Sequence, residues 1–354
     1  MAVMESGAKK TLQELLYKQL KPLVKKIDVN AYYPREYLES LGKHGFFLST
    51  GLPATDVLIR EMKLVEETAK VCMTTAFTIW CHLAALTYLR TCENAYLKNL
   101  LLPLLENGKV LGATGLSNPM KSYAGLESLR LKAERVSEGF VINGHLPSVS
   151  NLGQNHWFGI VASVHEKKQV MAFVPCNIQG LELKGKQEYL GLNGSATYSC
   201  TFNEVFIPDQ WIISKQADEF VKKIRPKFVM YQIPLGLGVT DASIQSMKKI
   251  QNKQNGCNQY LPIQPDELEN ELISIREKTF HLIQNSDLTQ HWEDLLEIRL
   301  NIAYLTLKAV HGAMLHHGGA GYFQQCDPSR RLRESYFLVN LTPTVKHLEK
   351  LLNS

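Results

Sequence analysis

Hydrophobic positions divide the chain into three zones. From residue 9 to residue 107 they recur at steps of three and four, the pattern of an amphipathic helix, as in Leu12, Leu15, Leu16, Leu20 and Val24. From Val110 to Ser214 the pattern becomes alternating, with many glycines and β-branched residues, which predicts short strands. Helical periodicity returns after Pro208. The sequence therefore predicts helices, then a β region, then helices.

The β zone contains one strong turn signal. Asn143-Gly144 stands inside GFVINGHLPSVSN (Gly139 to Asn151), between two short extended segments, and it predicts a hairpin. Further strands are predicted at 157–164, 169–174 and 199–207. Closely spaced antiparallel strands of this kind favour a small barrel or sandwich.

In the last zone, Pro265-Asp266 opens one helix, and a long amphipathic helix runs from Asp294 to His317 and stops at Gly318-Gly319. Residues 253–264 read as an exposed loop. We predict an α+β multidomain protein with boundaries 1–112, 113–215 and 216–354. Strands and helices do not alternate, which argues against a parallel α/β sheet.

One segment, Val71 to Leu89, has no charged residue and would be long enough to span a membrane. It contains four threonines and His82, and no second such segment exists, so we predict a helix buried in a bundle. Met1 to Lys10 has no apolar core of a signal peptide. The seven cysteines include no CxxC pair, which favours reduced thiols and a cytoplasmic protein.

Charge and small motifs narrow the chemistry further. A net charge of +5 spread over 354 residues is too weak to indicate nucleic acid binding. Gly236-Leu237-Gly238 lacks the third glycine of a dinucleotide fingerprint and is better explained by close helix packing. The histidines near 311–317 do not have metal-ligand spacing, so we predict no metal site. His82, alone on an apolar helix, is either a core residue or a functional one.

Five segments taken in order resemble the acyl-CoA dehydrogenase superfamily over essentially the whole chain. They are GATGLSNP (112–119), GFVINGHLPSVSN (139–151), TFNEVFIPDQWII (201–213), HGGAGYFQQCDPSRRLRES (317–335) and LTPT (341–344). The resemblance implies a helical N-terminal domain, a central antiparallel β-barrel or sandwich domain and a C-terminal four-helix bundle. It also implies a flavoprotein that assembles as a homodimer or homotetramer.

The resemblance carries individual site residues over to this chain. It implies that Leu116, Ser117, Ser148 and Ser150 lie around the flavin, with Ser150 near N5 and Ser148 in place of a tryptophan that covers the ring. Ser122 and Thr342 are implied to meet substrate. Gly318 and Gly319 are implied to pack beside the dinucleotide part of FAD, bound across a subunit interface. Thr344, which matches a threonine of the family's YEGT segment, is also implied to contact the cofactor.

Two departures from the family pattern concern catalysis and the cofactor. The family's dehydrogenases remove an α proton with a glutamate, and that position is Thr342 here, while the alternative position falls near Pro226. A threonine is a poor base without an activating partner. The family's phosphate-binding arginine also has no match in 255–260, which leaves FMN open as an alternative to FAD.

Three functions follow from the resemblance. The first is FAD-dependent α,β-dehydrogenation of an acyl thioester on CoA or an acyl-carrier protein, with electrons passed to an electron-transfer flavoprotein. The second is a monooxygenase of the same fold, which would take reduced FMN from a flavin reductase and use His82 and Ser150 at the flavin. The third is a paralogue that has lost catalysis. Superfamily resemblance alone does not choose among them.

Overall fold

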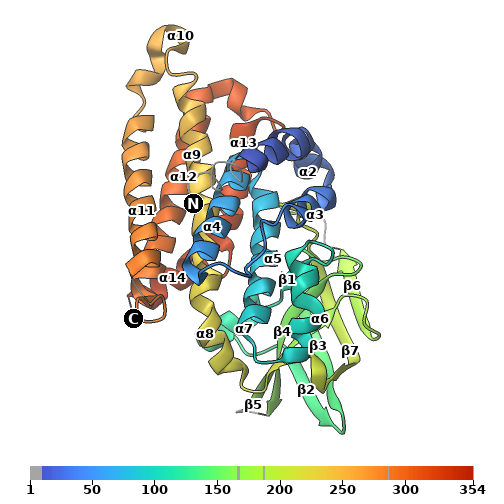
Figure 1. Cartoon of the computed structure of the whole chain (residues 1–354). Coiled ribbons are helices and arrows are strands. Elements are labelled where there is room, and N and C mark those ends of the chain that lie inside the picture. Colours follow the sequence, from blue (N-terminus) through green and yellow to red (C-terminus); the bar gives the residue numbers. More distant parts are fainter. Residues whose placement is uncertain (1–9, 166–167, 186–187, 286, 354) are drawn as a thin grey trace.

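The N-terminal zone forms a stack of helices, as its periodicity predicts. The computed structural model describes residues 10–165, 168–185, 188–285 and 287–353, and Figure 1 shows the helices above a sheet at one end of the molecule. Residues 10–15 are helical and lead into the first named elements. These are η1 (Leu16–Leu20), η2 (Lys21–Leu23), α2 (Val24–Asn30), α3 (Arg35–Lys43), α4 (Ala54–Val71), α5 (Met73–Thr91) and α6 (Ala95–Glu106).

Helix α5 contains most of the uncharged segment, from Met73 to Leu89, and its surroundings account for this composition. Every residue from Met73 to Leu89 is buried, with α4, α6, α8 and β1 packed around the helix. The predicted segment started at Val71, but Val71 is the last residue of α4. Cys72 has an extended backbone (φ −155°, ψ 107°) and separates the two helices, so α5 begins at Met73. The buried-helix prediction is confirmed. Across the described ranges, no helix is both long enough and apolar enough to cross a membrane.

The β zone forms one sheet whose strands follow the order β6-β7-β3-β2-β4-β5-β8, with β1 beside β4. Most pairings are antiparallel, as predicted, but β1 and β2 each run parallel to β4. A separate hydrophobic core lies within this sheet region, around Phe158, Phe202 and Ile207. The strands are β1 (Gly112–Thr114), β2 (Leu131–Val136), β3 (Gly139–Val149), β4 (Trp157–His165), β5 (Lys168–Pro175), β6 (Leu181–Gly185), β7 (Tyr198–Pro208) and β8 (Ile212–Ser214). Short helices α7 (Ser117–Tyr123), η3 (Asn193–Ser195) and η4 (Asp209–Trp211) connect them.

The predicted hairpin at Asn143-Gly144 is wrong. Both residues lie inside the continuous strand β3, and the chain reverses one turn earlier, between β2 and β3. Gly144 (φ 132°) marks a break in the register with β7, and a Cβ there would lie 2.3 Å from the carbonyl oxygen of Arg130. Asn143 accepts a hydrogen bond from the amide of Glu204 on β7. Asn143 and Gly144 therefore form a bulge instead of a turn, and the position of Gly144 requires glycine.

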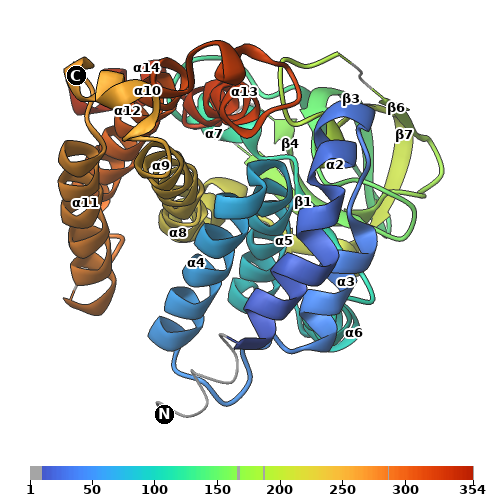
Figure 2. The same cartoon turned by 90° about the horizontal axis from the view of Figure 1, so that it is seen from above.

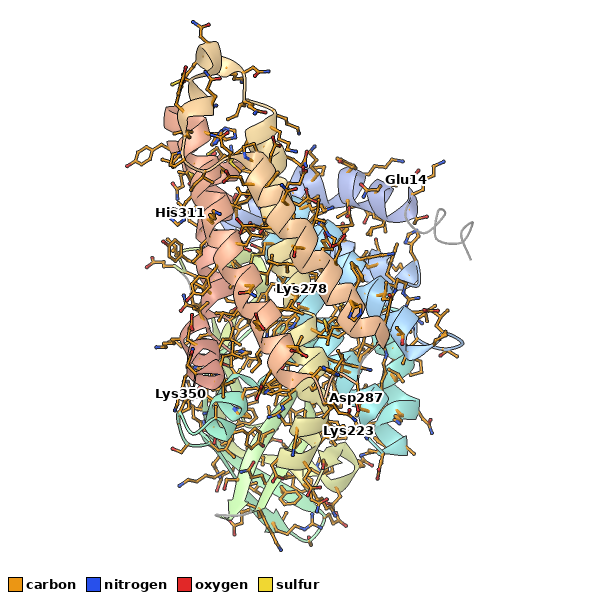
Figure 3. The ribbon with its side chains drawn as sticks, turned by 90° about the vertical axis from the view of Figure 1, so that its left-hand side faces the viewer. Glu14, Lys223, Lys278, Asp287, His311 and Lys350 are labelled. Carbon is orange, nitrogen blue, oxygen red and sulfur yellow. The ribbon has the colours of Figure 1, made fainter. Side chains whose placement is uncertain are left out.

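The C-terminal zone is a helical bundle. Its helices are α8 (Ala217–Met230), α9 (Ile233–Lys248), α10 (Lys253–Gly256), η5 (Cys257–Tyr260), α11 (Pro265–Asn285), α12 (Trp292–His317), η6 (Gly318–Tyr322), α13 (Asp327–Asn340) and α14 (Val345–Leu352). The predicted loop at 253–264 contains two helical turns, which Gln264 stabilises by donating to the carbonyls of Asn258 and Leu261. Figure 3 shows α11 on the outer face of the bundle, where Lys278 is exposed.

The N-terminal and C-terminal helical zones are far apart in the sequence but share one hydrophobic core in the folded protein. Helix α9 packs against both α4 and α12, and seen from above it lies between the N-terminal helices and α11 (Figure 2). The small residues Gly236 and Gly238 make this possible, because a Cβ on Gly238 would lie 2.4 Å from the carbonyl oxygen of Glu66. The close-packing prediction for this glycine pair is confirmed.

Candidate functional site

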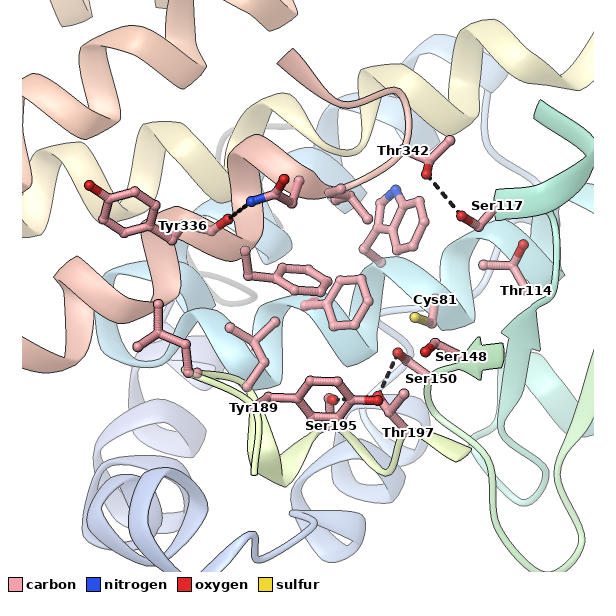
Figure 4. A pocket seen from close by; sticks show the side chains of 18 of the residues that line it. Cys81, Thr114, Ser117, Ser148, Ser150, Tyr189, Ser195, Thr197, Tyr336 and Thr342 are labelled. Carbon is pink, nitrogen blue, oxygen red and sulfur yellow. Dashed lines mark hydrogen bonds between the residues drawn. The ribbon is translucent and has the colours of Figure 1, made fainter. Parts of the chain in front are cut away.

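A cavity of about 450 Å³ lies where the β region meets helices α5, α8 and α13. Its β side is formed by the end of β3 and by residues 188–197 before β7, here called the β6–β7 loop. Its helical side is formed by side chains from the three helices and the segment after α13. Figure 4 shows the labelled side chains converging on this space from segments far apart in the sequence.

The β side is rich in hydroxyl groups. Ser150 Oγ lies 2.7 Å from Thr197 Oγ1, which lies 2.8 Å from Ser195 Oγ, so three hydroxyls form a continuous chain (Figure 4). Ser148 lines the same cavity two residues before Ser150, because alternate residues of a strand share one face. Hydroxyls both donate and accept hydrogen bonds, so this side can bind the polar edge of a ligand.

The helical side is aromatic. Phe77 and Trp80 project from α5, with ring centroids 5.4 Å apart. The Phe77 ring also meets Phe337 of α13 at 4.5 Å, and Trp80 meets Phe228 of α8 at 4.8 Å. The indole N–H of Trp80 donates to the carbonyl of Phe228. This interlocked cluster gives the cavity a rigid apolar surface suited to a planar or acyl group.

Ser117 and Thr342 meet at one edge of the cavity. Their hydroxyl oxygens lie 2.9 Å apart, although they come from the start of α7 and from the segment after α13. Thr342 is 5% exposed and Ser117 is exposed. The hydrogen bond between the two hydroxyls therefore connects the buried Thr342 in the cavity with Ser117 at the protein surface.

A buried arginine holds the segment that carries Thr342. Arg299 of α12 is fully buried, and it donates to the side-chain oxygen of Gln232 at 2.9 Å and to the carbonyl of Leu338 at 2.7 Å. Gln232 in turn donates to the carbonyl of Thr342 at 2.8 Å. Burial lowers the pKa of Arg299 to about 10. The two hydrogen bonds in series fix the backbone on which Thr342 is presented.

The cavity has little titratable chemistry. Among the described residues that line it there is no aspartate, glutamate or histidine, and Arg333 is the one charged residue. Both terminal nitrogens of Arg333 donate to Asp28, at 2.7 and 2.6 Å, so its charge is already paired. A reaction that needs a strong general base therefore lacks one among these lining residues.

Comparison with known proteins shows which proteins this chain is similar to in sequence. No protein-family model matches the chain. The short-chain-specific acyl-CoA dehydrogenase of Clostridium acetobutylicum is 28% identical over 222 residues, which span 59% of this chain but only 57% of that relative. An acyl-CoA dehydrogenase of Bacillus subtilis is 21% identical, with 92% of this chain and 91% of the relative covered.

Solved structures show the same fold. Butyryl-CoA dehydrogenase from Megasphaera elsdenii superposes with a TM-score of 0.88 at 15% identity, covering 98% of this chain and 96% of that one. A structure described as PigA with FAD and proline superposes with a TM-score of 0.83 at 16% identity, covering 99% and 96%. The chain therefore has the acyl-CoA dehydrogenase fold, and its sequence is similar to acyl-CoA dehydrogenases.

Four of the residues that superfamily resemblance singled out line the cavity. Ser117, Ser148, Ser150 and Thr342 come together there from three separate segments. Leu116 is buried immediately before α7, where its amide donates to Thr114. Thr344 caps the start of α14 by accepting from the amide of His347.

The other predicted residues lie elsewhere. Ser122 is on α7 beside Tyr123, which lines a second cavity. Gly318 and Gly319 are exposed at the end of α12, and a Cβ on either would meet nothing within 4 Å. They are absent from the side chains lining the first cavity. Their contact with the dinucleotide part of FAD stays a prediction.

His82 is also outside the cavity lining. Its Nδ1 accepts from the amide of Gly112 at 2.9 Å and its Nε2 lies 3.1 Å from the carbonyl of Leu105, so the ring joins α5 to β1 and α6. Because Nδ1 accepts, Nε2 carries the proton, and both ring nitrogens have backbone partners. Burial lowers the pKa of His82 to about 3. These contacts support a structural role for His82, and its catalytic role stays a prediction.

The low pKa of His82 predicts a pH dependence of stability. The unfolded chain binds a proton there below about pH 6.5 and the folded chain does not until about pH 3. The contribution is thus complete at pH 7 and falls by about 1.4 kcal/mol per pH unit between pH 6 and pH 4. We expect the free energy of unfolding of His82→Asn, measured in urea, to depend on pH less steeply than that of the wild type, by about 1.4 kcal/mol per pH unit. His145→Asn, at an exposed position on β3, serves as control; equal slopes in all three proteins would refute the assignment.

Several lining residues were missed by the sequence analysis. They are Tyr189, Ser195 and Thr197 of the β6–β7 loop, Thr114, and the aromatic cluster. The signal available was the glycine-containing run LGLNGSAT (190–197), which interrupts the strands without being a simple turn. The aromatic residues gave no signal, because an aromatic helix face in a core looks the same in the sequence.

The residues present fit the ring portion of a flavin. That ring needs hydrogen-bond donors and acceptors along one polar edge and apolar contacts on its remainder, and the hydroxyl and aromatic sides of the cavity provide both. The hydroxyl of Tyr189 is buried with no hydrogen-bond partner among the described residues, so it has an unused group to offer such a ligand. Over the same residues, no cluster of three or more His, Cys, Asp or Glu side chains could hold a metal ion.

Proposed function

We propose that this protein binds FAD in the cavity and catalyses α,β-dehydrogenation of an acyl thioester. The observation that carries this proposal is the two-sided cavity, with a hydroxyl side for the cofactor and an aromatic side for the acyl group, in a chain of this superfamily. FAD is proposed rather than FMN because a solved neighbour of the same fold is described with FAD.

In the proposed reaction the flavin, when bound, supplies the hydride acceptor. Ser150, Thr197 and Ser195 bind the polar edge of the ring through their hydroxyl chain. The aromatic cluster excludes water from the acyl group and orients it. Thr342 lines the cavity at the family's base position. Its hydroxyl, 2.9 Å from that of the exposed Ser117, would relay the α proton to a base in the solvent, because neither hydroxyl is basic enough to keep that proton.

A second cavity, of about 380 Å³, suits the carrier arm of the thioester. The two cavities are lined by consecutive residues of the segment after α13, because Thr342 lines the first and Pro343 the second. Lys222 and Arg225 of α8 line it together with His347, whose two ring nitrogens are buried without a hydrogen-bond partner in the described part of the chain. Such groups can satisfy the amides and phosphate of a pantetheine arm, whether it belongs to CoA or to a carrier protein.

The monooxygenase alternative required His82 and Ser150 on the same ligand. Ser150 lines the cavity, whereas His82 does not and has both nitrogens bonded to backbone. Within the described ranges, no imidazole lines the cavity. The dehydrogenase function is therefore the better supported of the two.

We also propose that the protein works as a homo-oligomer and passes electrons to an electron-transferring flavoprotein. The exposed Gly318 and Gly319 adjoin Tyr322 and Phe323, which are 85% and 73% exposed. Large apolar side chains exposed together are typical of a surface that another protein covers. This supports a subunit contact at the end of α12.

The proposed function predicts substrate-driven reduction of the bound flavin. The holoprotein is mixed without oxygen with saturated acyl-CoA and acyl-pantetheine thioesters of increasing length, while flavin absorbance is followed and the products are separated. We expect slow bleaching with formation of the 2-enoyl thioester, two hydrogens lighter than the substrate. A flavin that stays oxidised across the whole panel, in a protein that retains FAD, would sink the proposed activity.

A further inference from the structure

Tyr189 presents a buried polar atom to the cavity without a partner. Its hydroxyl is closed off from solvent, and within the described residues no donor or acceptor reaches it. Tyr189, Ser195 and Thr197 all line the β side of the cavity (Figure 4). A phenol hydroxyl buried in this way is costly unless a ligand or a water molecule satisfies it. Its partner is therefore expected on whatever occupies the cavity.

The β6–β7 loop holds Tyr189 in a fixed position. The amide of Tyr189 donates to the side-chain oxygen of Asn193 at 2.9 Å, and the side-chain nitrogen of Asn193 donates back to the carbonyl of Tyr189 at 2.9 Å. Leu192 (φ 61°) and Ala196 (φ 50°) have left-handed backbone conformations, which residues with side chains rarely adopt. Such conformations persist only where the surroundings enforce them, and they concentrate at functional sites.

A close contact between Gly191 and the backbone of α13 fixes the position of the loop. A Cβ on Gly191 would lie 3.1 Å from the backbone carbonyl of Arg333. Arg333 is itself anchored by its two hydrogen bonds to Asp28. The loop thus packs directly against α13 at an anchored residue. Tyr189 is therefore held at the cavity before any ligand binds.

Tyr189 also differs chemically from its neighbours. The other lining residues on the β side are hydroxyl-bearing, aliphatic or glycine, so Tyr189 is the aromatic group of that side. Ser148, which shares the side, contributes only a small hydroxyl. A flat ring bound against the hydroxyl chain would find its aromatic neighbour on this side in Tyr189 alone.

We propose that Tyr189 is a cofactor-contacting residue, whose hydroxyl bonds to the bound flavin and whose ring packs against it. This inference rests on the proposed function, because it requires the flavin to occupy this cavity. It assigns to the β6–β7 loop a direct part in cofactor binding. The ligand class it selects is a planar conjugated ring with a polar edge.

The test separates the hydroxyl from the ring. Full-length wild-type protein, Tyr189→Phe and Tyr189→Leu are freed of flavin and titrated with FAD, and the dissociation constant and the fluorescence of the bound flavin are measured. Loss of one hydrogen bond should raise the dissociation constant of Tyr189→Phe about threefold to tenfold. Because a phenol in contact with a flavin quenches its fluorescence by electron transfer, the bound flavin should fluoresce more strongly in both variants. Tyr189→Leu should bind FAD more weakly than Tyr189→Phe.

Tyr198→Phe is the matched control, since Tyr198 packs against the β core and is not among the lining residues. It should match the wild type in both measurements. If wild type binds FAD and Tyr189→Phe matches it in affinity and fluorescence, the inference is overturned while the proposed function stands. If wild type itself binds no FAD, the proposed function fails and the inference fails with it. Should Tyr189→Leu not fold, Tyr189→Phe alone still decides.

Discussion

Replacing Thr342 with glutamate is expected to raise the rate of anaerobic flavin reduction by an acyl thioester at least about 100-fold over wild type. Thr342 lines the cavity, and its backbone is held by Gln232. No carboxylate or imidazole lines the cavity in the part of the chain that the structure describes. A carboxylate there has room to enter the cavity and can accept the α proton, which a threonine hydroxyl does poorly. Rapid mixing of each holoprotein with the same thioester, followed by flavin absorbance, measures the effect.

Thr342→Gln is the control, because it matches glutamate in size but cannot act as a base. The rate in Thr342→Glu should rise with pH and level off above the pKa of the new carboxyl group, since only the ionised form accepts a proton. That pKa is expected above its value in water, because the neighbouring aromatic side chains desolvate the carboxylate. Equal rates in the glutamate and glutamine variants would show that proton removal does not limit the reaction at this position.

Arg90→Met is expected to lower the free energy of unfolding by about 3–5 kcal/mol. Arg90 of α5 donates to Glu61 at 2.8 Å and to Glu106 at 3.2 Å, and these two carboxylates are 0% and 5% exposed. Removing the guanidinium leaves two buried negative charges without their cation, which is far more costly than losing an exposed ion pair. Urea unfolding at pH 7 measures the change.

Arg135→Met provides the comparison for this prediction. Arg135 makes two hydrogen bonds to Asp209, at 2.5 and 2.7 Å, but both side chains are about 40% exposed. The same substitution there should have a much smaller effect, because water replaces the lost contacts. Similar losses in the two variants would mean that burial of Glu61 and Glu106 does not set the energetic cost.

The order of the elements followed from local periodicity, because helices and strands impose repeats of 3.6 and 2 on the side chains they bury. The segment around Asn143-Gly144 shows where this reasoning fails. The dipeptide is compatible with a turn or with a bulge, and the bulge forms because β3 is paired with both β2 and β7, which no local signal reveals.

Resemblance placed Ser117, Ser150 and Thr342 in a common site, and the fold brings them together. It did not distinguish the role of His82, because a buried histidine bonded to backbone and a histidine facing a flavin have the same neighbours along the helix. Nor did it find Tyr189, whose importance depends on a hydroxyl left without a partner once the loop has folded.

The sequence by itself determined the succession of helices, strands and helices and the burial of α5, and it predicted that a threonine occupies the family's base position. These depend on residue identity and on spacing within a few turns or strands. Only the tertiary structure decided which side chains share the cavity, because its sides come from α5, β3, the β6–β7 loop and the segment after α13. Contacts between such distant segments arise from packing of the two helical zones against the sheet, and packing depends on the whole set of buried residues rather than on any local pattern.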